Sequence, residues 1–385
     1  MFLLKLIFKN AFRHRLRAWL TILSITTAIL AFGLLRTVIS AWYVGVEAAS
    51  ANRLVTRNAV SFIFPLPLSY NEKIRAIPGV RQVTYATWFG GVYIDEKNFF
   101  PSFAGEFRTY LALYPEYVIP PDQLEALLRD RKGFAAGRKL VNRFGWKIGD
   151  NVVLKGTIFP GNWEFVLRAV YRGRTDNVDE TMFLFHWDYL NEKLKQTSPS
   201  RADQVGFYLI GVERPESAAD TAAAIDNTFK NSFAETLTET EKAFNMSFIS
   251  MSEAIIMVIR LVSLAVIIII MAVAANTMSM TVRERIGEFA VLKTLGFGAW
   301  RITALILGES LVITLLGALF GILFTFPAAQ AFGNALSMYF PVFRVSADTI
   351  YLDAAAGFSV GFVAAIIPSW RAVRIRIADG LRRIG

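Results

Sequence analysis

The chain has 385 residues, of which 54% are hydrophobic and only 19% are charged, against roughly 25% charged in ordinary soluble proteins. This composition indicates a membrane protein. It excludes a disordered chain, a collagen-like repeat and a soluble nucleic-acid binder, although the formal net charge is +10. The sequence has no cysteine and only two histidines, so disulfides, thiolate metal sites and thiol nucleophiles are excluded as well.

The positive charge is concentrated toward the two ends of the chain. Residues 43–250 contain 24 basic and 24 acidic side chains, so the whole excess of +10 lies in the other 177 residues. This distribution predicts a neutral soluble domain framed by basic membrane segments. We expect membrane lipids, and no nucleic acid, beside the basic segments.

The first 46 residues predict a membrane anchor. We expect residues 1–16 to form an amphipathic cytoplasmic segment and residues 17–46 to form transmembrane helix 1 with a protruding stalk, because a bilayer core needs roughly 20 apolar helical residues. A cleaved signal peptide is the alternative. The apolar run is longer than the roughly 7–15 residues of a signal peptide, and no small-residue cleavage site follows it, so we expect an uncleaved anchor.

Residues 47–250 have the pattern of a mixed α and β domain. In the predicted strand 163–172, period-two alternation places five apolar side chains on one face: Trp163, Phe165, Leu167, Ala169 and Tyr171. Strand and helix patterns in about 50–115 are echoed in about 205–250. We therefore expect a split α/β part over these two stretches, with a β-rich insertion at about 118–200.

Three further apolar segments follow the domain. We expect transmembrane helix 2 with its stalk at 252–282, transmembrane helix 3 at 302–330 and transmembrane helix 4 at 349–370. Between and after them we expect a short cytoplasmic helix at 283–300, an extracytoplasmic loop at 331–348 and a basic cytoplasmic tail at 371–385.

Basic residues cluster in the N-terminal segment, in 283–300 and in the tail, whereas the loop 331–348 contains only Arg344. Positive flanks stay on the cytoplasmic side, which places both termini in the cytoplasm. The expected fold class is a membrane protein with four transmembrane α-helices plus an α+β extracytoplasmic domain between helices 1 and 2.

Small and polar residues mark the predicted spans. Glycines in small-xxx-small pairs favour close packing between helices, although glycine is also simply common in membrane helices: Gly317, Gly321, Gly357 and Gly361. Glu309 lies about two turns inside the third span. We expect a structural role for it rather than a proton relay, because no second acid, histidine or lysine lies at comparable depth.

No motif for catalysis is present. The sequence lacks the G-x-x-x-x-G-K-[ST] phosphate loop, the G-x-S-x-G nucleophile elbow and the H-E-x-x-H metal motif. Asp176, Asp179 and Glu180 form a small acidic cluster, for which a solvated loop is favoured over a metal site because no further ligands are evident. We expect no enzyme activity, no metal site and no bound cofactor in this chain.

The sequence VRERIGEFAVLKTLG at residues 282–296 resembles the stretch between the second and third spans of the FtsX-like permease family of MacB-type ABC transporters. Residues 366–382 resemble the C-terminal ending of that family, with Ala378 where a proline is usual. Residues 135–156 are similar to its extracytoplasmic core domain.

The resemblance implies that the segment after the second span is a coupling helix that docks on a separate ABC ATPase, which binds the ATP. Phe289 and Leu292 are predicted to form its apolar ridge, and Gly296 is predicted to end it. Four charged residues would surround the ridge: Arg283, Glu284, Arg285 and Glu288. A helix resting on lipid headgroups is the alternative.

The expected function is that of a permease subunit in the bacterial inner membrane. It would couple ATP hydrolysis by the separate subunit to conformational change in the extracytoplasmic domain, and so drive export or release of a substrate from the periplasmic side. The resemblance further implies a second copy of this chain or a homologous permease, and a periplasmic adaptor protein. One alternative is an FtsX-like regulator that passes ATPase motion to an external enzyme or sensor without moving cargo. Another is a non-ABC anchor that displays a binding domain.

Overall fold

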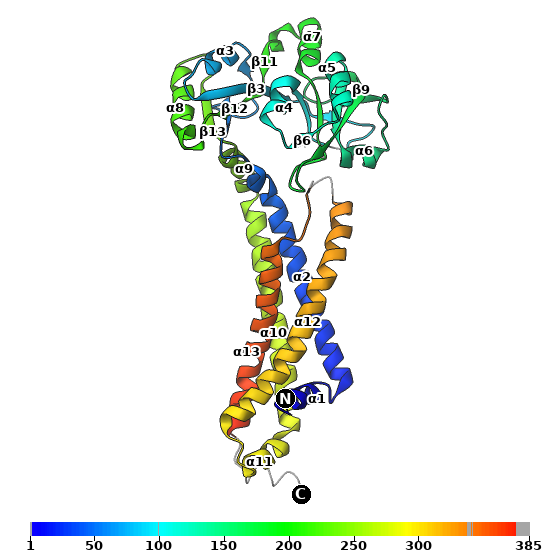
Figure 1. Ribbon diagram of the computed structural model, residues 1–385, viewed down its shortest axis with the longest axis vertical. Coiled ribbons are helices and arrows are strands. Elements are labelled where there is room, and N and C mark those ends of the chain that lie inside the picture. The colour runs from blue at the N-terminus through cyan, green and yellow to red at the C-terminus, as the bar shows by residue number, and fades with distance from the viewer. Residues whose placement is uncertain (1, 99, 337–339, 341, 375–385) are drawn as a thin grey trace. The chain divides into compact units, whose positions relative to one another are not determined.

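The computed structural model of the protein describes residues 2–98, 100–336, 340 and 342–374 (Figure 1). The chain forms two compact units. The first contains the described residues of 1–41, 252–335 and 343–374, and the second contains residues 42–251 and the described residues of 336–342. From residue 375 onward, the predicted basic tail lies outside the described residues, as do 337–339 and 341 of the predicted loop 331–348.

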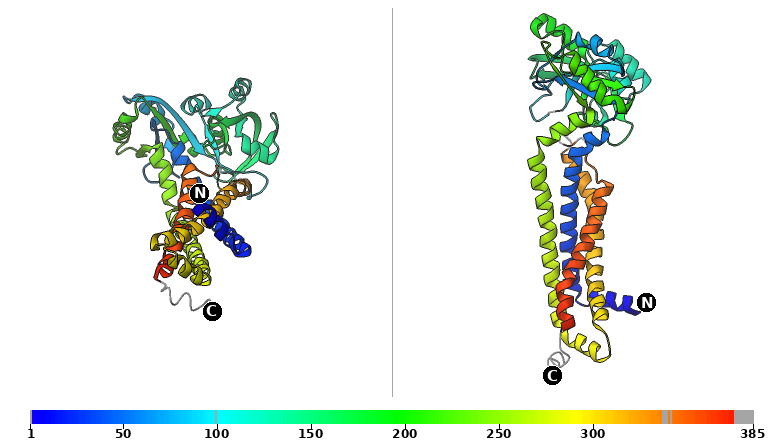
Figure 2. Two further views of the ribbon diagram at one scale, coloured as in Figure 1. Left: turned by 60° about the horizontal axis from the view of Figure 1, so that its bottom comes forward. Right: turned by 90° about the vertical axis from the view of Figure 1, so that its left-hand side faces the viewer.

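The first unit, the helical bundle, is built from four long helices that run side by side in both figures (Figures 1 and 2). These four are long and apolar enough to cross a membrane: α2 (Arg15–Ala48), α10 (Glu253–Glu284), α12 (Ala299–Ala335) and α13 (Ala347–Arg374). Two short helices lie at one end of the bundle: α1 (Phe2–Ala11) and α11 (Ile286–Thr294). The prediction of four long apolar helices is therefore confirmed.

The connection between α10 and α12 differs in detail from the single helix predicted at 283–300. Helix α10 continues through Glu284, the backbone leaves the helical conformation at Arg285, and α11 is only 9 residues long. The break has a physical cause, because the Arg285 side chain turns inward to an ion pair that is described below. Helix α12 then begins at Ala299, three residues before the predicted start of the third span.

The second unit, the mixed domain, is organised around one sheet that the structure describes as eleven-stranded, with the order β13-β1-β12-β3-β5-β10-β7-β9-β8-β4 and with β6 paired to β9. Its strands are β1 (Arg53–Asn58), β3 (Val80–Trp88), β4 (Gly91–Val92), β5 (Ser102–Gly105), β6 (Tyr117–Val118), β7 (Gly133–Gly137), β8 (Asn151–Gly156), β9 (Gly161–Gly173), β10 (Phe183–His186), β12 (Phe207–Val212) and β13 (Thr236–Thr240). A small second sheet pairs β2 (Leu66–Pro67) with β11 (Gln204–Val205).

Helices pack on both faces of this sheet. They are α3 (Tyr70–Arg75), α4 (Phe107–Leu113), α5 (Pro121–Arg129), α6 (Arg138–Phe144), α7 (Trp187–Thr197), α8 (Ala218–Thr228) and α9 (Glu241–Ser250). Neighbouring residues of one strand point to opposite faces, so Leu54 enters one hydrophobic core and Val55 enters the other. The domain therefore has two cores, one on each side of the sheet.

The longest strand, β9, follows the predicted alternation. All five apolar side chains of the predicted face, from Trp163 to Tyr171, are buried, while Glu164 is exposed. Strand β8 pairs with β9 as an antiparallel hairpin, with Val152 opposite Phe165 and Leu154 opposite Trp163. The turn and the apolar face of this hairpin both lie within 23 residues, from 151 to 173.

The two predicted parts of the domain share one continuous sheet. Strands from the two flanking stretches, β13, β1, β12 and β3, occupy one end of the sheet, and strands from the middle stretch occupy the other end. Strand β5 joins them, since it pairs antiparallel with β3 and parallel with β10. The middle stretch therefore extends the sheet instead of forming a separate layer.

Candidate functional site

The short helix α11 has a defined C-terminal end. Gly296 has a φ of +85°, a left-handed conformation that glycine adopts without a Cβ penalty. Its N–H donates to the carbonyl of Lys293, and the N–H of Phe297 donates to the carbonyl of Leu292. These two hydrogen bonds make a Schellman motif, which is the role expected for Gly296.

A buried ion pair attaches this connection to the third span. Nη1 of Arg285 donates to both carboxylate oxygens of Glu309, at 2.8 Å and 2.7 Å, and both residues are buried. Nδ2 of Asn10, near the end of α1, donates to the same carboxylate at 2.9 Å. Glu309 is therefore the acceptor that joins α1, the α10–α11 break and α12.

A second layer of charges surrounds this ion pair on its exposed side. Glu288 accepts from Nε of Arg285 at 2.9 Å and also pairs with Arg13. Glu284 forms a bidentate pair with Arg17, with two N···O distances of 2.8 Å. Partial burial acts to raise the pKa of Glu288, but the hydrogen bonds from Arg13 and Arg285 outweigh it and lower the pKa below its usual value.

The predicted apolar ridge of α11 faces into the bundle, and its role as the anchor for a partner stays a prediction. Phe289 is 1% exposed and packs in a cluster with Ile302 of α12 and Ala365 of α13, against which Leu292 also packs. The Arg285 side chain also turns inward, and its guanidinium lies over the Phe289 ring, 5.2 Å from the ring centre. This contact helps to hold the Phe289 side of α11 against the bundle.

Other side chains form the exposed surface of this connection. Arg283 is exposed, and Val291 and Leu295, four residues apart, are 40% and 70% exposed. Trp300, at the start of α12, is also exposed. Val291 in α11 and Leu295, the residue directly after it, therefore form an exposed apolar pair that is separate from the predicted ridge.

The four glycines of the small-xxx-small pairs lie where helices approach closely. A Cβ added at Gly317 or Gly321 would lie 2.7 Å from the Cβ of Ile25 or Ile29 of α2. Added carbons at Gly357 and Gly361 of α13 would overlap Ala318 and Thr314 of α12. Thr26 donates to the carbonyl of Gly317 at 3.1 Å, and Ser310 donates to the carbonyl of Gly361 at 2.8 Å.

One buried carboxylate of the bundle has no hydrogen-bond donor. Asp353 of α13 is 1% exposed, and neither of its oxygens has a partner among the described residues. Its Oδ2 lies 2.7 Å from where a Cβ of Gly33 would stand, and Thr325 lies beside the same position. Arg36 of α2 acts electrostatically on Asp353, and its own buried Nε also has no partner in the described part of the chain.

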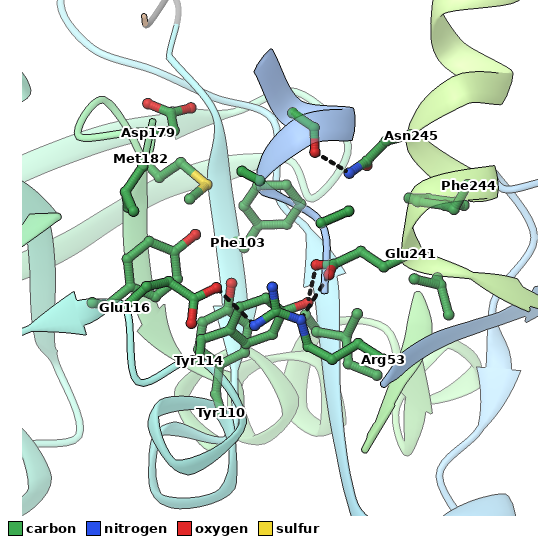
Figure 3. A pocket seen from close by; sticks show the side chains of 18 of the residues that line it. Arg53, Phe103, Tyr110, Tyr114, Glu116, Asp179, Met182, Glu241, Phe244 and Asn245 are labelled. Carbon is green, nitrogen blue, oxygen red and sulfur yellow. Dashed lines mark hydrogen bonds and ion pairs between the residues drawn. The ribbon is translucent and has the colours of Figure 1, made fainter. Parts of the chain in front are cut away.

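The mixed domain contains a cavity of about 280 Å³ on one face of its sheet (Figure 3). Strands β1, β5 and β12 form its floor, and residues 45–49 and the start of α9 form its rim. Arg53 lies buried inside it, with Nε 2.7 Å from Glu241 and Nη1 2.7 Å from Glu116. Glu241 also accepts from the Tyr114 hydroxyl at 3.0 Å and from the Ser50 N–H at 2.9 Å.

Asp179, which the sequence places in a small acidic cluster predicted to be solvated, lines this cavity. Its Oδ1 accepts from the N–H and the hydroxyl of Thr181 at 2.7 Å and 2.6 Å. Burial raises its pKa above the usual value in spite of these hydrogen bonds. No group of three or more metal-ligating side chains occurs among the described residues.

Sequence reasoning missed the Arg285–Glu309 pair, the exposed Val291–Leu295 face and the cavity. The first had a usable signal, because an arginine directly after one span and a glutamate inside the next are both costly to leave unpaired. The cavity had no such signal in the sequence, because its lining residues are spread from residue 45 to residue 245.

Comparison with known proteins finds a family match for the C-terminal part of the chain. Residues 260–377 match the family model described as FtsX-like permease C-terminal. The comparison with curated proteins finds no match.

Two solved structures are similar to part of the chain. One is the extracellular domain of the noncanonical ABC-type transporter YknZ from Gram-positive bacteria, with 11% identity and a TM-score of 0.34, covering 49% of this chain and 100% of that chain. The other is a domain of a protein described as a permease from Porphyromonas gingivalis, with 13% identity and a TM-score of 0.33, covering 49% of this chain and 90% of that chain. The residues that match the FtsX-like permease C-terminal model, 260–377, contain α11, α12, α13 and most of α10.

Proposed function

We propose that this chain is the membrane subunit of an ABC-type transporter and receives movement from a separate ATPase at helix α11. The observation that carries the proposal is the exposed apolar pair formed by Val291 of α11 and Leu295 directly after it, within the residues that match the FtsX-like model. An isolated helix of 9 residues has little stability of its own, so α11 keeps its position through its contacts with the bundle. The Arg285–Glu309 pair and the buried Phe289 supply those contacts.

The orientation is part of the same proposal. The basic N-terminal segment and the basic α10–α12 connection favour the cytoplasmic side, which places α1 and α11 beside the ATPase and the mixed domain outside the cytoplasm. Movement delivered to α11 would then pass along α10 and α12 toward the other side of the membrane. Export or release of a substrate there is the function that this arrangement supports best.

The docking role is tested by expressing the chain together with the ABC ATPase whose gene lies nearest to its own. The variant Val291→Ala/Leu295→Ala removes the exposed pair. Anchoring side chains contribute roughly 2 kcal/mol or more each, which corresponds to about a 30-fold loss of affinity for a single anchor. We therefore expect loss of ATPase copurification and loss of ATPase stimulation by the chain.

The matched control is Leu264→Ala/Ile268→Ala, an equally spaced exposed apolar pair on α10. This control should keep both ATPase copurification and stimulation. Equal behaviour of the two double variants would refute docking at α11.

The orientation is tested with an impermeant maleimide added to intact cells. It should label the variant Asp150→Cys and not Thr294→Cys, both at exposed positions of this cysteine-free chain. Labelling of both would contradict it.

A further inference from the structure

The cavity of the mixed domain has an excess of carboxyl groups. Its charged lining consists of one cation, Arg53, and three acids, Glu116, Asp179 and Glu241. Figure 3 shows these side chains around the same space. Arg53 is already satisfied, because Nε is bonded to Glu241 and Nη1 to Glu116 and to the carbonyl of Leu113.

Two carboxylate oxygens in the cavity still have acceptor capacity. Oε1 of Glu116 accepts from Arg53, and Oδ1 of Asp179 accepts from Thr181, but neither Oε2 of Glu116 nor Oδ2 of Asp179 has a donor among the described residues. Glu241, by contrast, accepts from three donors. Arg53 pairs with both Glu116 and Glu241 at 2.7 Å and balances one of these two charges, so the lining keeps an excess of carboxylate charge, to which Asp179 adds although Lys139 acts on it from outside the lining.

The remaining wall is aromatic and apolar. Phe103 and Phe207 have ring centroids 6.3 Å apart, and Phe244 lies 6.4 Å from Phe207. On the other side Tyr110 stacks on Tyr114 at 4.8 Å and lies 6.1 Å from Tyr117. Burial raises the pKa of these tyrosines above its usual value, so their rings stay neutral.

The guanidinium of Arg53 already lies over the Tyr114 ring at 4.2 Å, which leaves the phenylalanine group Phe103, Phe207 and Phe244 as aromatic surface for a ligand. Aromatic rings beside an excess of carboxylates form the environment that recognises an organic cation. The ring quadrupole attracts the positive charge, the carboxylates add Coulomb attraction, and the rings cover the apolar body of the ligand. An anion is disfavoured, because the single arginine has already paired with two acids. A neutral apolar ligand would leave the excess carboxylate charge unused.

We propose that this cavity is a binding site for an organic cation with an apolar body, such as a quaternary ammonium compound. Glu116 and Asp179 supply the charge, and the phenylalanine group covers the body. The site belongs to the mixed domain alone, so its occupancy is measured without an ATPase and does not depend on the transport role proposed for the chain.

The test uses the full chain in lipid nanodiscs and three probes of similar size: benzyltrimethylammonium, its neutral carbon isostere neopentylbenzene, and benzenesulfonate. Equilibrium dialysis against protein-containing and empty nanodiscs gives the specific binding of each probe. We expect saturable binding of the cation at one site per chain and no saturable binding of the other two. Saturable binding of benzenesulfonate, or of the neutral probe with equal affinity, would overturn the proposal.

The variants Glu116→Gln and Asp179→Asn should each weaken binding of the cation by roughly tenfold, because each removes one negative charge from the lining of the cavity. The matched control, Glu213→Gln, removes an exposed carboxylate of the same domain outside the cavity and should leave the affinity unchanged. Unfolding midpoints of all variants confirm that the domain is folded. Unchanged affinity in both cavity variants, or absence of cation binding to the unaltered chain, would refute the assignment.

Discussion

The buried pair between Arg285 and Glu309 makes a quantitative prediction, because its two members are not equally supported by their neighbours. Without Glu309, Arg285 keeps a hydrogen bond to the half-exposed Glu288. Without Arg285, Glu309 keeps only the amide of Asn10. Removing one partner of a buried pair typically costs about 3–5 kcal/mol, because the other charge is left uncompensated.

We therefore expect Arg285→Met to lower the free energy of unfolding of the bundle by about 4 kcal/mol, and Glu309→Leu to lower it by about 2 kcal/mol. The double variant removes both charges and replaces them with apolar groups of similar volume, so its stability should return to within about 1 kcal/mol of the unaltered chain. The difference between the loss of stability in the double variant and the sum of the two single losses measures the interaction between Arg285 and Glu309.

Unfolding of the purified chain in mixed micelles, titrated with SDS and followed by tryptophan fluorescence, measures these three differences. The matched control is Arg283→Met, which removes an exposed arginine two residues earlier and should change stability by less than about 0.5 kcal/mol. Additive losses in the double variant, or a loss below about 1 kcal/mol for Arg285→Met, would refute the reasoning.

Two further predictions concern carboxyl groups. Asp353→Asn should raise the free energy of unfolding of the bundle by about 1 kcal/mol in the same titration, because both buried oxygens of Asp353 lack donors; a loss of stability would contradict this. For Asp179, burial raises the pKa in the folded chain above its usual 3.8, so its contribution to stability is complete below pH 3.8 and is lost as the pH rises through the raised value. The unfolding temperatures of Asp179→Asn and the unaltered chain should therefore coincide at low pH and separate toward neutral pH, with the variant more stable; parallel curves would exclude this linkage.

Local pattern was enough for the parts of the fold that depend on length and periodicity. Four apolar runs of sufficient length predict the four long helices, and period-two alternation predicts the buried face of β9. Gly296 was predictable for the same reason, since a glycine after a helical pattern is the usual residue of a Schellman end. In each case the information lies within a few turns or one hairpin.

Which side of α11 packs against the bundle was not predictable from local pattern. The sequence predicts Phe289 with Leu292 as the outward ridge of this segment, but spacing alone does not decide whether these side chains or others face the bundle. The decision comes from Arg285 and Glu309, which are 24 residues apart. Once this ion pair fixes the rotation of the chain at the α10–α11 break, Phe289 must point into the bundle.

The same reasoning explains why the connection would serve as a stiff coupling element. Of the contacts that hold α11, one is the ion pair of Arg285 with Glu309, in the first third of α12, and another is the buried ring of Phe289 between α12 and α13. Helix α12 in turn packs closely against α2 at Gly317 and Gly321 and against α13 at Gly357 and Gly361, where an added Cβ would overlap the neighbouring helix. Close-packed interfaces change by discrete rearrangement instead of continuous deformation, so a displacement of α11 by a partner at Val291 and Leu295 would reach α2 and α13 through α12.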